Sequence, residues 1–319
     1  MAAEFPAPAR EPQSAATVLM VRPARFAFNP QTAGSNAFQR PAARGGSDAS
    51  VSERALREFD AVAAALAGAG VRVIVAADDE RPAKPDAVFP NNWVSFHHDG
   101  TVVLYPMMAP NRRAERREEI IRQVAAEGRV HVARTVDLTA HEGEGRYLEG
   151  TGSLVLDRTH RVAYAALSAR TDLDPLGDFS QQLDYELVTF DTRDPGGGAV
   201  YHTNVLMAVG ERFAVLCGEA IVSGAHRAAV EEKLAATGHE VIGLTTSQMA
   251  CFAGNLLELE GSQGKILALS TTAWESLSAP QRRALESHAR VLPLAIPVIE
   301  RHGGGSVRCM LAEVHLPAS

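Results

Sequence analysis

Short apolar segments of strand character alternate along this chain with longer segments whose apolar residues recur at helical spacing. The helical periodicity predicts helices at 52–67, 112–127, 224–237 and 279–290. Segments rich in β-branched, leucine and aromatic residues predict strands at 17–22, 71–76, 93–97, 101–105, 153–157, 162–166, 186–191, 204–209, 212–217, 255–260, 265–270 and 308–314. The alternation of the two element types predicts an α/β fold.

The predicted elements recur in one order, which is a hairpin, a helix and a return strand. Hairpins open near residues 93, 153, 204, 255 and 308, at intervals of roughly 50 to 60 residues. Five such units favour a closed, five-bladed α/β propeller with pseudo-fivefold symmetry over an open sheet. The fifth hairpin lacks its second strand, so we expect the early strand 17–22 to complete it. The alternative is an irregular α/β domain with accidental spacing.

The start of the chain differs from the rest in composition. Residues 1–15 are rich in Ala and Pro and lack periodicity, so we expect a disordered or loosely packed leader followed by one domain over 16–319. No segment approaches the roughly 18 uninterrupted apolar residues of a membrane span, and the N-terminus lacks the apolar core of a signal peptide. We therefore expect a cytoplasmic protein without a membrane partner.

Composition and charge exclude further classes of protein. The chain has 31 Lys and Arg against 38 Asp and Glu, a formal charge of −7, and no basic tract that could bind nucleic acid. Gly150 and Gly152 lack the third glycine of a dinucleotide fingerprint, and there is no GxxxxGK sequence. The three cysteines form no CxxC pair and the histidines no HExxH motif, so we expect neither a metal nor an organic cofactor.

Residues whose side chains could take part in catalysis or binding occur at one recurring place, just before or at the first strand of each hairpin. Equivalent positions of a propeller converge at one end of the ring, so these residues would share a pocket. A thiol, an imidazole and a carboxylate brought together there would supply a nucleophile, a general acid/base and an orienting group. The residues at these positions are Asn91 and Asn92, Glu149, His202, Gly254 and Asn255, and Cys309.

Each candidate also has a structural interpretation. Cys217 lies inside an apolar segment and reads as a core thiol, whereas Cys251 is compatible with either role. Cys309 follows three glycines, which allow close approach to a ligand, and Arg308 beside it would favour a thiolate. His202 could equally be a routine residue at a strand end, and Glu149 a solvated loop charge.

Five motifs together resemble the guanidino-group-modifying superfamily of the pentein fold. They are FPNNW at 89–93, LEGTGS at 148–153, LSART at 167–171, YHTN at 201–204 and GGGSVRC at 303–309. The superfamily includes arginine deiminase, dimethylarginine dimethylaminohydrolase, amidinotransferases and succinylarginine dihydrolase, and the pattern is most similar to the citrulline-utilisation hydrolases. The resemblance covers about 17–316 and implies a five-bladed propeller and a Cys-His-Glu catalytic set without a cofactor.

The resemblance also implies roles for individual residues. Cys309 would be the nucleophile, His202 the acid/base, and Glu149 the carboxylate that holds the imidazole or the substrate nitrogens. Asp86, three residues before Phe89, would hold the substrate α-amino group, and Phe89 would lie beside the substrate. Arg170 would bind the α-carboxylate with its bidentate fork. The alignment leaves open whether Arg112 or Arg113 assists.

Two departures from the family pattern concern substrate charge. Asn92 stands where arginine-processing relatives carry an aspartate, and Asn204 replaces the aspartate of a His-x-Asp motif. Neutral amides can donate to a carbonyl oxygen and attract a cation less than carboxylates do, so we expect a ureido substrate of citrulline type to be preferred over arginine.

The expected activity is hydrolysis of a C–N bond at the ureido or guanidino carbon of an amino acid through a covalent intermediate on Cys309. Transfer to an amine acceptor, as in an amidinotransferase, is one alternative. A non-catalytic binding protein of pentein fold is the other, because such rings also occur in ribosome-associated factors. The expected partner is a small amino-acid substrate, with a homodimer left open.

Overall fold

The computed structural model describes residues 11–41 and 48–319, and their strands form five sheets of three strands each. In every sheet an antiparallel hairpin is followed, after a helix, by a parallel strand. Four sheets follow one another along the chain: β3 (Val94–Phe96), β4 (Thr101–Leu104) and β5 (Arg134–Asp137); β6 (Val155–Asp157), β7 (Val162–Leu167) and β8 (Glu186–Asp191); β9 (Met207–Val209), β10 (Phe213–Leu216) and β11 (Glu240–Gly243); β12 (Leu257–Gly261), β13 (Gly264–Ser270) and β14 (Arg290–Leu294).

The fifth sheet joins the two ends of the described chain. Strand β15 (Ala312–Glu313) pairs antiparallel with β1 (Thr17–Arg22), and β2 (Arg72–Ala77) pairs parallel with β1. The expectation that strand 17–22 completes the fifth hairpin is therefore confirmed, as are the α/β class and the five units. Strand pairing among the described residues gives five separate sheets and does not join them into one ring. The closed propeller is therefore not shown by the strand pairing.

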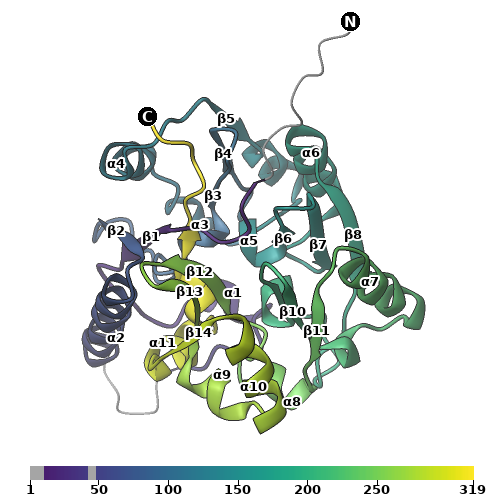
Figure 1. Cartoon of the computed structure of the whole chain (residues 1–319). Coiled ribbons are helices and arrows are strands. Elements are labelled where there is room, and N and C mark those ends of the chain that lie inside the picture. The colour runs from purple at the N-terminus through teal and green to yellow at the C-terminus, as the bar shows by residue number, and fades with distance from the viewer. Residues whose placement is uncertain (1–10, 42–47) are drawn as a thin grey trace, which may run out of the picture.

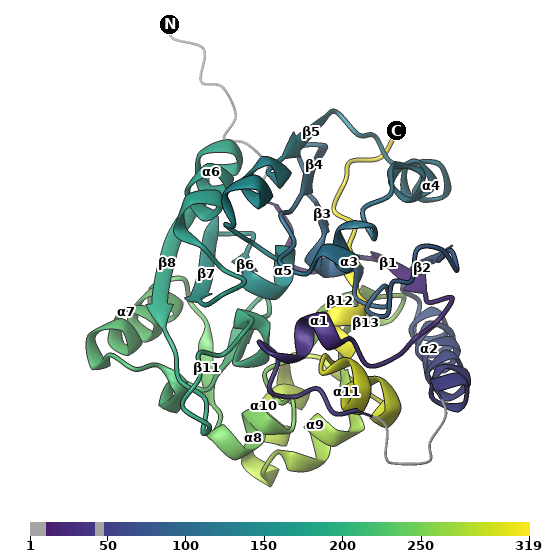
Figure 2. The same ribbon diagram turned by 180° about the vertical axis from the view of Figure 1, so that it is seen from behind.

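Helices form the crossovers that parallel strands require. Figures 1 and 2 show these crossover helices around the outside of the molecule, with the hairpins nearer its middle. Each presents an apolar side to its sheet; in α4, for example, Ile120 and Val124 are buried. The crossovers are α2 (Asp48–Gly68), α4 (Glu118–Gly128), α6 (Leu173–Leu183), α7 (Gly224–Ala236), and α9 (Thr271–Ser276) with α10 (Ala279–His288).

A short helical turn precedes the first strand in four of the five hairpins, and a turn after α8 (Thr246–Ala250) precedes the other. These turns shift the start of several strands by two or more residues from the predicted positions. They are η1 (Pro90–Asn92), α5 (Gly150–Ser153), η3 (Thr203–Val205) and η5 (Val307–Met310). The remaining short helices are α1 (Pro30–Ala33), α3 (Pro110–Arg113), η2 (Thr139–Glu144), η4 (Gly218–Ala220) and α11 (Pro297–Gly303).

The expected leader needs a correction for its last part. Residues 1–10 lie outside the described residues, but 11–15 belong to the packed structure. Gln13 donates from Nε2 to the carbonyls of Leu156 and Val209, and its Oε1 accepts the backbone N–H of Arg158. Segment 11–15 thus contacts two sheets through polar side chains, which a search for apolar periodicity does not detect. None of the helices in the described ranges is long and apolar enough to cross a membrane.

Candidate active site

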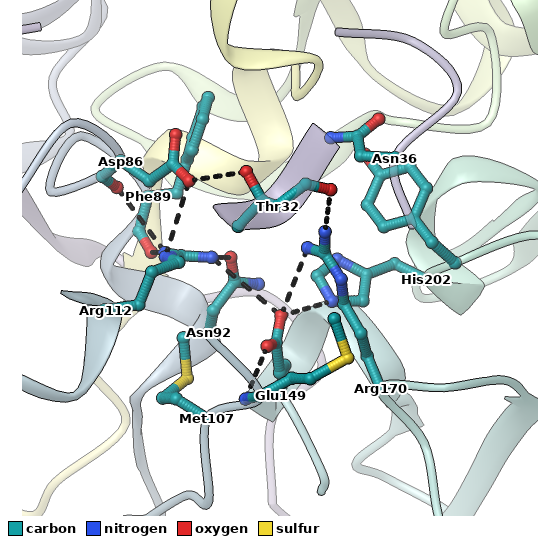
Figure 3. A network of polar contacts seen from close by, with 12 residues as sticks. Thr32, Asn36, Asp86, Phe89, Asn92, Met107, Arg112, Glu149, Arg170 and His202 are labelled. Carbon is teal, nitrogen blue, oxygen red and sulfur yellow. Dashed lines mark hydrogen bonds and ion pairs between the residues drawn. The ribbon is translucent and has the colours of Figure 1, made fainter. Parts of the chain in front are cut away.

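The helical turns that precede the hairpins meet around a small cavity. Most of the predicted site residues line this cavity, and all of the lining residues are buried. Figure 3 shows part of its polar network. The lining residues are Asn36, Asp86, Phe89, Asn92, Arg112, Arg170, Tyr201, His202, Gly303, Gly304, Gly305 and Cys309.

Cys309 lies in the turn η5 and receives hydrogen bonds from two asparagine amides. The Nδ2 atoms of Asn255 and Asn204 lie 3.2 and 3.6 Å from its Sγ. The orientation of the Asn255 amide is fixed, because its Oδ1 accepts the backbone N–H of Arg308 at 3.1 Å. Nδ2 must then face the sulfur. The sulfur therefore lies within reach of two N–H donors.

The imidazole of His202 lies against the carboxylate of Glu149. Each residue directly precedes a short helical turn: His202 is the N-cap of η3, and Glu149 is the N-cap of α5. Nε2 of His202 is 2.9 Å from Oε2 of Glu149, and Oε1 accepts the backbone N–H of Met108 (Figure 3). The carboxylate therefore fixes the orientation of the ring.

Burial and charge set the protonation of this pair. Burial lowers the pKa of His202 to about 4, against the opposing effect of Glu149, so the imidazole is neutral at pH 7. Burial alone would raise the pKa of Glu149, but Arg170, the hydrogen bond from His202 and Arg112 hold it well below its usual range. The site at rest thus contains a neutral imidazole beside an ionised carboxylate.

Asn92 presents an unpaired amide group to the cavity. Its Oδ1 accepts from Nη1 of Arg112 at 2.8 Å, and its buried Nδ2 has no hydrogen-bond partner. A guanidinium can only donate, so this bond determines which end of the amide faces Arg112. Gly152 provides the necessary space, because a Cβ there would lie 2.4 Å from this Nδ2. Of the two arginines that the alignment left open, Arg112 lines the cavity.

Arg113 points elsewhere, with its Nε 3.0 Å from the carbonyl of Met107 and 3.3 Å from Glu142. Arg112, by contrast, also pairs with Glu115 at 2.9 Å and donates to the backbone carbonyl of Phe89 at 3.2 Å. Burial raises the pKa of Glu115 to about 7 in spite of this pairing.

A polar segment over 29–39, which sequence reasoning missed, contacts the two groups expected to hold the amino-acid end of a substrate. Oδ2 of Asp86 accepts from Nδ2 of Asn29 at 2.8 Å, whereas its buried Oδ1 has no partner. Arg170 donates to the carbonyl of Thr32 at 2.9 Å and to Oγ of Ser35 at 2.7 Å. The segment lacks regular periodicity, so nothing in its pattern marked it.

Arg170 lies beside the His202–Glu149 pair as well as near this segment. Its Nη1 lies 3.4 Å from Oε2 of Glu149, and its guanidinium lies over the ring of Tyr201 at 5.1 Å. Tyr201, also missed, donates its hydroxyl to the carbonyl of Gly304 at 2.5 Å. Phe89 packs against the glycine loop, where a Cβ on Gly303 would lie 2.8 Å from its ring.

The structure also places the other two thiols and Arg308. Cys217 is buried in the main hydrophobic cluster, which confirms it as a core thiol, and burial raises its pKa to about 11. Cys251 caps the end of α8 and does not line the cavity. Arg308, expected to support a thiolate, donates to Glu313 at 2.8 Å and to the carbonyl of Leu311 at 2.9 Å. Burial lowers the pKa of Arg308, and the charges of Glu313 and Cys309 oppose this lowering. The hydrogen bonds to Cys309 come from the amides of Asn204 and Asn255, and the repeat-equivalent position of Asn255 was a signal for its place in the site.

The arrangement brings a thiol, a neutral imidazole with its carboxylate, and an unpaired amide donor to one cavity. A thiol can transfer its proton to a neutral imidazole and attack a planar carbon, and the imidazole can return the proton to a leaving nitrogen. The site is therefore equipped for nucleophilic catalysis on a small polar ligand.

Comparison with families matches residues 22–316 to the family described as "N,N dimethylarginine dimethylhydrolase, eukaryotic". No curated protein matches the chain.

Among solved structures, the N-terminal domain of ArgZ, an arginine dihydrolase from the ornithine-ammonia cycle in cyanobacteria, is 18% identical, with a TM-score of 0.71 over 95% of this chain and 99% of that one. Unliganded AgrE is also 18% identical at a TM-score of 0.71, but this chain covers only 40% of it. A dimethylarginine dimethylaminohydrolase variant, as an adduct with S-methyl-L-thiocitrulline, is 16% identical, with a TM-score of 0.62 over 93% of this chain and 98% of that one. At these identities the structures establish the fold.

Proposed function

The chain belongs to the eukaryotic N,N dimethylarginine dimethylhydrolase family, and from that premise we propose that it hydrolyses a C–N bond at the guanidino or ureido carbon of an arginine-type amino acid. The resemblance to guanidino-group-modifying enzymes is thereby confirmed. Family membership also makes the chain a hydrolase of non-peptide C–N bonds. The roles of individual residues and the choice of substrate are proposals.

In the first half of the proposed reaction, neutral His202 accepts the proton of Cys309, and the thiolate attacks the planar carbon of the substrate. The C–S bond forms as the C–N bond breaks, and His202 returns the proton to the departing nitrogen as ammonia or an amine leaves. In the second half, His202 takes a proton from water, the hydroxide attacks the same carbon, and the C–S bond breaks. The thiol is regenerated, and no electrons are exchanged with another reactant.

The observation that carries the substrate proposal is a pair of unpartnered buried atoms in the cavity. Oδ1 of Asp86 is an acceptor without a donor, and Nδ2 of Asn92 is a donor without an acceptor. A buried polar atom costs about 1–3 kcal/mol when it is left unpaired, so each favours a ligand group of opposite kind. An α-ammonium group suits the first atom and a ureido oxygen suits the second.

The fixed charges support the same choice. The cationic side chains of Arg112 and Arg170 both line the cavity, and Glu149 and Glu115 are already paired with them. A guanidinium entering beside Asn92 would meet an N–H donor and these cations. We therefore propose that a ureido compound of citrulline type is turned over in preference to the guanidino compound, with Asp86 holding the amino group.

We propose in addition that the five units surround this cavity as the blades of a closed pentein ring. Support comes from the equivalent placement of Asn92, Glu149, His202 and Cys309 before successive hairpins. Isolated bridges between neighbouring sheets, such as Phe96 with Val314, add to this support.

The function is tested by incubating the full chain with arginine, citrulline, their N-acylated forms and methylarginines, and measuring ammonia and amine release. We expect turnover of at least one of these compounds, with a ten- to hundredfold preference for the ureido member of a matched pair, equivalent to roughly 1–3 kcal/mol. The matched variant Asn92→Asp should move the preference towards the guanidino member.

Other outcomes would distinguish other functions. Turnover that depends on an added amine would indicate amidinotransfer instead of hydrolysis. A wild-type protein that prefers guanidino compounds, with a ratio that Asn92→Asp leaves unchanged, would contradict the substrate proposal. No turnover of any compound would contradict the hydrolase proposal.

A further inference from the structure

Three side chains with metal-binding atoms gather at a place that takes no part in lining the cavity. Asp157 ends β6, His160 lies in the turn that leads to β7, and His239 immediately precedes β11 in the next sheet. One carboxylate oxygen and one nitrogen of each imidazole lie within 4.8 Å of one another. Figure 1 shows the sheet that contains β6 beside the sheet that contains β11.

The carboxylate of Asp157 is buried, and its side-chain neighbours at short distance are imidazoles. Only 1% of its side chain is exposed, and no Lys or Arg among the described residues forms an ion pair with it. Its Oδ1 accepts the backbone N–H of His160 at 3.0 Å, which fixes the direction of the group. Oδ2 faces both imidazoles, 2.9 Å from Nδ1 of His160 and 3.9 Å from Nε2 of His239. Buried charges of this kind are paired or coordinate metals.

The ring of His239 is held by a second hydrogen bond on its other side. Nδ1 lies 2.9 Å from Oγ1 of Thr237, and that hydroxyl donates to the helix carbonyls of Lys233 and Leu234 at 3.0 and 3.1 Å. Because that hydroxyl donates to the carbonyls, it can accept from Nδ1–H, and in this tautomer Nε2 of His239 is the atom available to a metal ion. Nε2 lies 3.9 Å from Oδ2 of Asp157 and 3.2 Å from the carbonyl of Gly210.

An imidazole whose far nitrogen is oriented by such a partner is the arrangement found in protein metal sites. Acceptor atoms that face one another are stabilised by a cation between them. Ligands at about 2.0–2.2 Å from a tetrahedral zinc ion lie roughly 3.3–3.6 Å apart. The observed separations of 2.9 and 3.9 Å bracket this spacing, so small side-chain movements would complete the site.

We propose that Asp157, His160 and His239 bind a divalent metal ion of zinc type, with a water molecule in the fourth position. The side chain of His160 is 29% exposed and provides the entrance from solvent. The ion would connect the β6–β7 turn to the segment before β11 and so stabilise the contact between two sheets. Motif spacing led to the opposite expectation, that no metal is bound, because the third ligand comes from a distant segment.

The test uses the full chain with Cys309→Ser, so that metal binding to the cavity thiol does not contribute. Isothermal titration with Zn²⁺ and the visible absorption of Co²⁺ should both show one bound equivalent. Asp157→Asn and His160→Gln should each weaken binding at least tenfold. The matched control is His141→Gln. It removes one member of a similar pair, His141 and Asp178 at 2.8 Å, which has no third ligand. This variant should bind the metal ion as tightly as the parent does.

Thermal unfolding supplies an independent readout. Zinc should raise the melting temperature of the parent and of His141→Gln, but not of His160→Gln. In the protein that retains Cys309, chelation should lower the melting temperature and leave turnover unchanged. Absence of a one-equivalent site, or equal binding by His160→Gln, Asp157→Asn and the parent, would overturn the proposal. The two ligand variants keep the test decisive if one of them fails to fold.

Discussion

At the scale of single residues, the amides of three asparagines lie at the sulfur and in the cavity. Asn255 and Asn204 donate to the sulfur of Cys309, and Asn92 offers a free donor to the ligand. Each amide is oriented by a bond whose direction is unambiguous, such as the backbone N–H of Arg308 on Asn255. The groups that contact the sulfur and the unpaired donor in the cavity are thus neutral amides.

The first prediction concerns Asn255. Asn255→Ala removes the nearer donor to the thiolate and should slow alkylation of Cys309 by iodoacetamide at pH 7 about ten- to a hundredfold, because a hydrogen bond to a charged group contributes about 1.5–3 kcal/mol. Asn204→Ala, which removes the longer bond, should have a smaller effect. Equal alkylation rates in Asn255→Ala and the wild type would show that the amide only fills space.

The second prediction follows from the lowered pKa of His202. Between pH 6.5 and 4 the unfolded chain binds a proton at this residue and the folded chain does not, so the free energy of unfolding falls as the pH falls through this range. Between pH 7.5 and 5 this group should account for about 2 kcal/mol of the loss. The variant His202→Gln can still donate to Glu149 but does not titrate. In urea unfolding, its free energy of unfolding should fall by about 2 kcal/mol less between pH 7.5 and 5 than that of the wild type. A variant with the same loss as the wild type would contradict the assigned protonation.

At the scale of elements, the short helical turn before each hairpin presents the reactive groups. The turn α5 passes so close to Asn92 and His202 that only glycine fits at position 152. An added Cβ would lie 2.4 Å from Nδ2 of Asn92 and 2.7 Å from Nδ1 of His202. The position of the backbone is therefore part of the site.

The third prediction compares two glycine substitutions. Gly152→Ala should displace both side chains, destabilise the fold by about 1–3 kcal/mol and reduce kcat more than tenfold. Gly177→Ala, on helix α6 with open space around the added Cβ, should leave kcat unchanged and stabilise by roughly 0.5–1 kcal/mol. Calorimetry and steady-state kinetics on both variants check this. Normal kinetics in Gly152→Ala would contradict the required close approach.

The predicted elements show what periodicity can detect. Central strands such as β1 and β7 lie within one residue of their predicted bounds, because buried apolar segments define them. The edge strand β8 also begins and ends where predicted. Return strands β5, β11 and β14 were not predicted individually, since they are half-exposed and short; β5 reads Arg-Thr-Val-Asp.

The candidate site could be predicted only in part. Repeat-equivalent positions and motifs led to Cys309, His202 and Asn92, which line one cavity, and to Glu149, which contacts His202. The roles assigned to them stay predictions. The polar segment 29–39 could not be found, because its contacts arise from tertiary packing of residues without periodicity. Tyr201 stands in the YHTN motif, but its contacts with Arg170 and Gly304 arise only in the folded chain.

At the scale of the whole molecule, segment 11–15 connects parts that are distant in sequence. Gln13 joins Leu156 at β6 to Val209 at β9, and Glu11 pairs with Arg158 at 2.9 Å. The fourth prediction is that Gln13→Ala lowers the free energy of unfolding by about 1–3 kcal/mol, because it leaves buried backbone groups unpaired.

Chemical denaturation measures this loss, and the exposed Gln181→Ala on α6 is the control, expected within about 0.5 kcal/mol of the wild type. Equal stability of the two variants would mean that the contacts of Gln13 contribute nothing to the free energy of unfolding. The homodimer stays a prediction, which the mass in solution would test.

The central claim is that Cys309 forms a covalent intermediate during hydrolysis of a C–N bond. The most direct measurement is rapid acid quench during turnover, followed by intact mass and peptide mapping. We predict an adduct on Cys309 in the wild type and in Cys217→Ala and Cys251→Ala, which should also retain turnover. Cys309→Ser should show neither the adduct nor turnover. Turnover by Cys309→Ser, or an adduct on a different residue, would contradict the account.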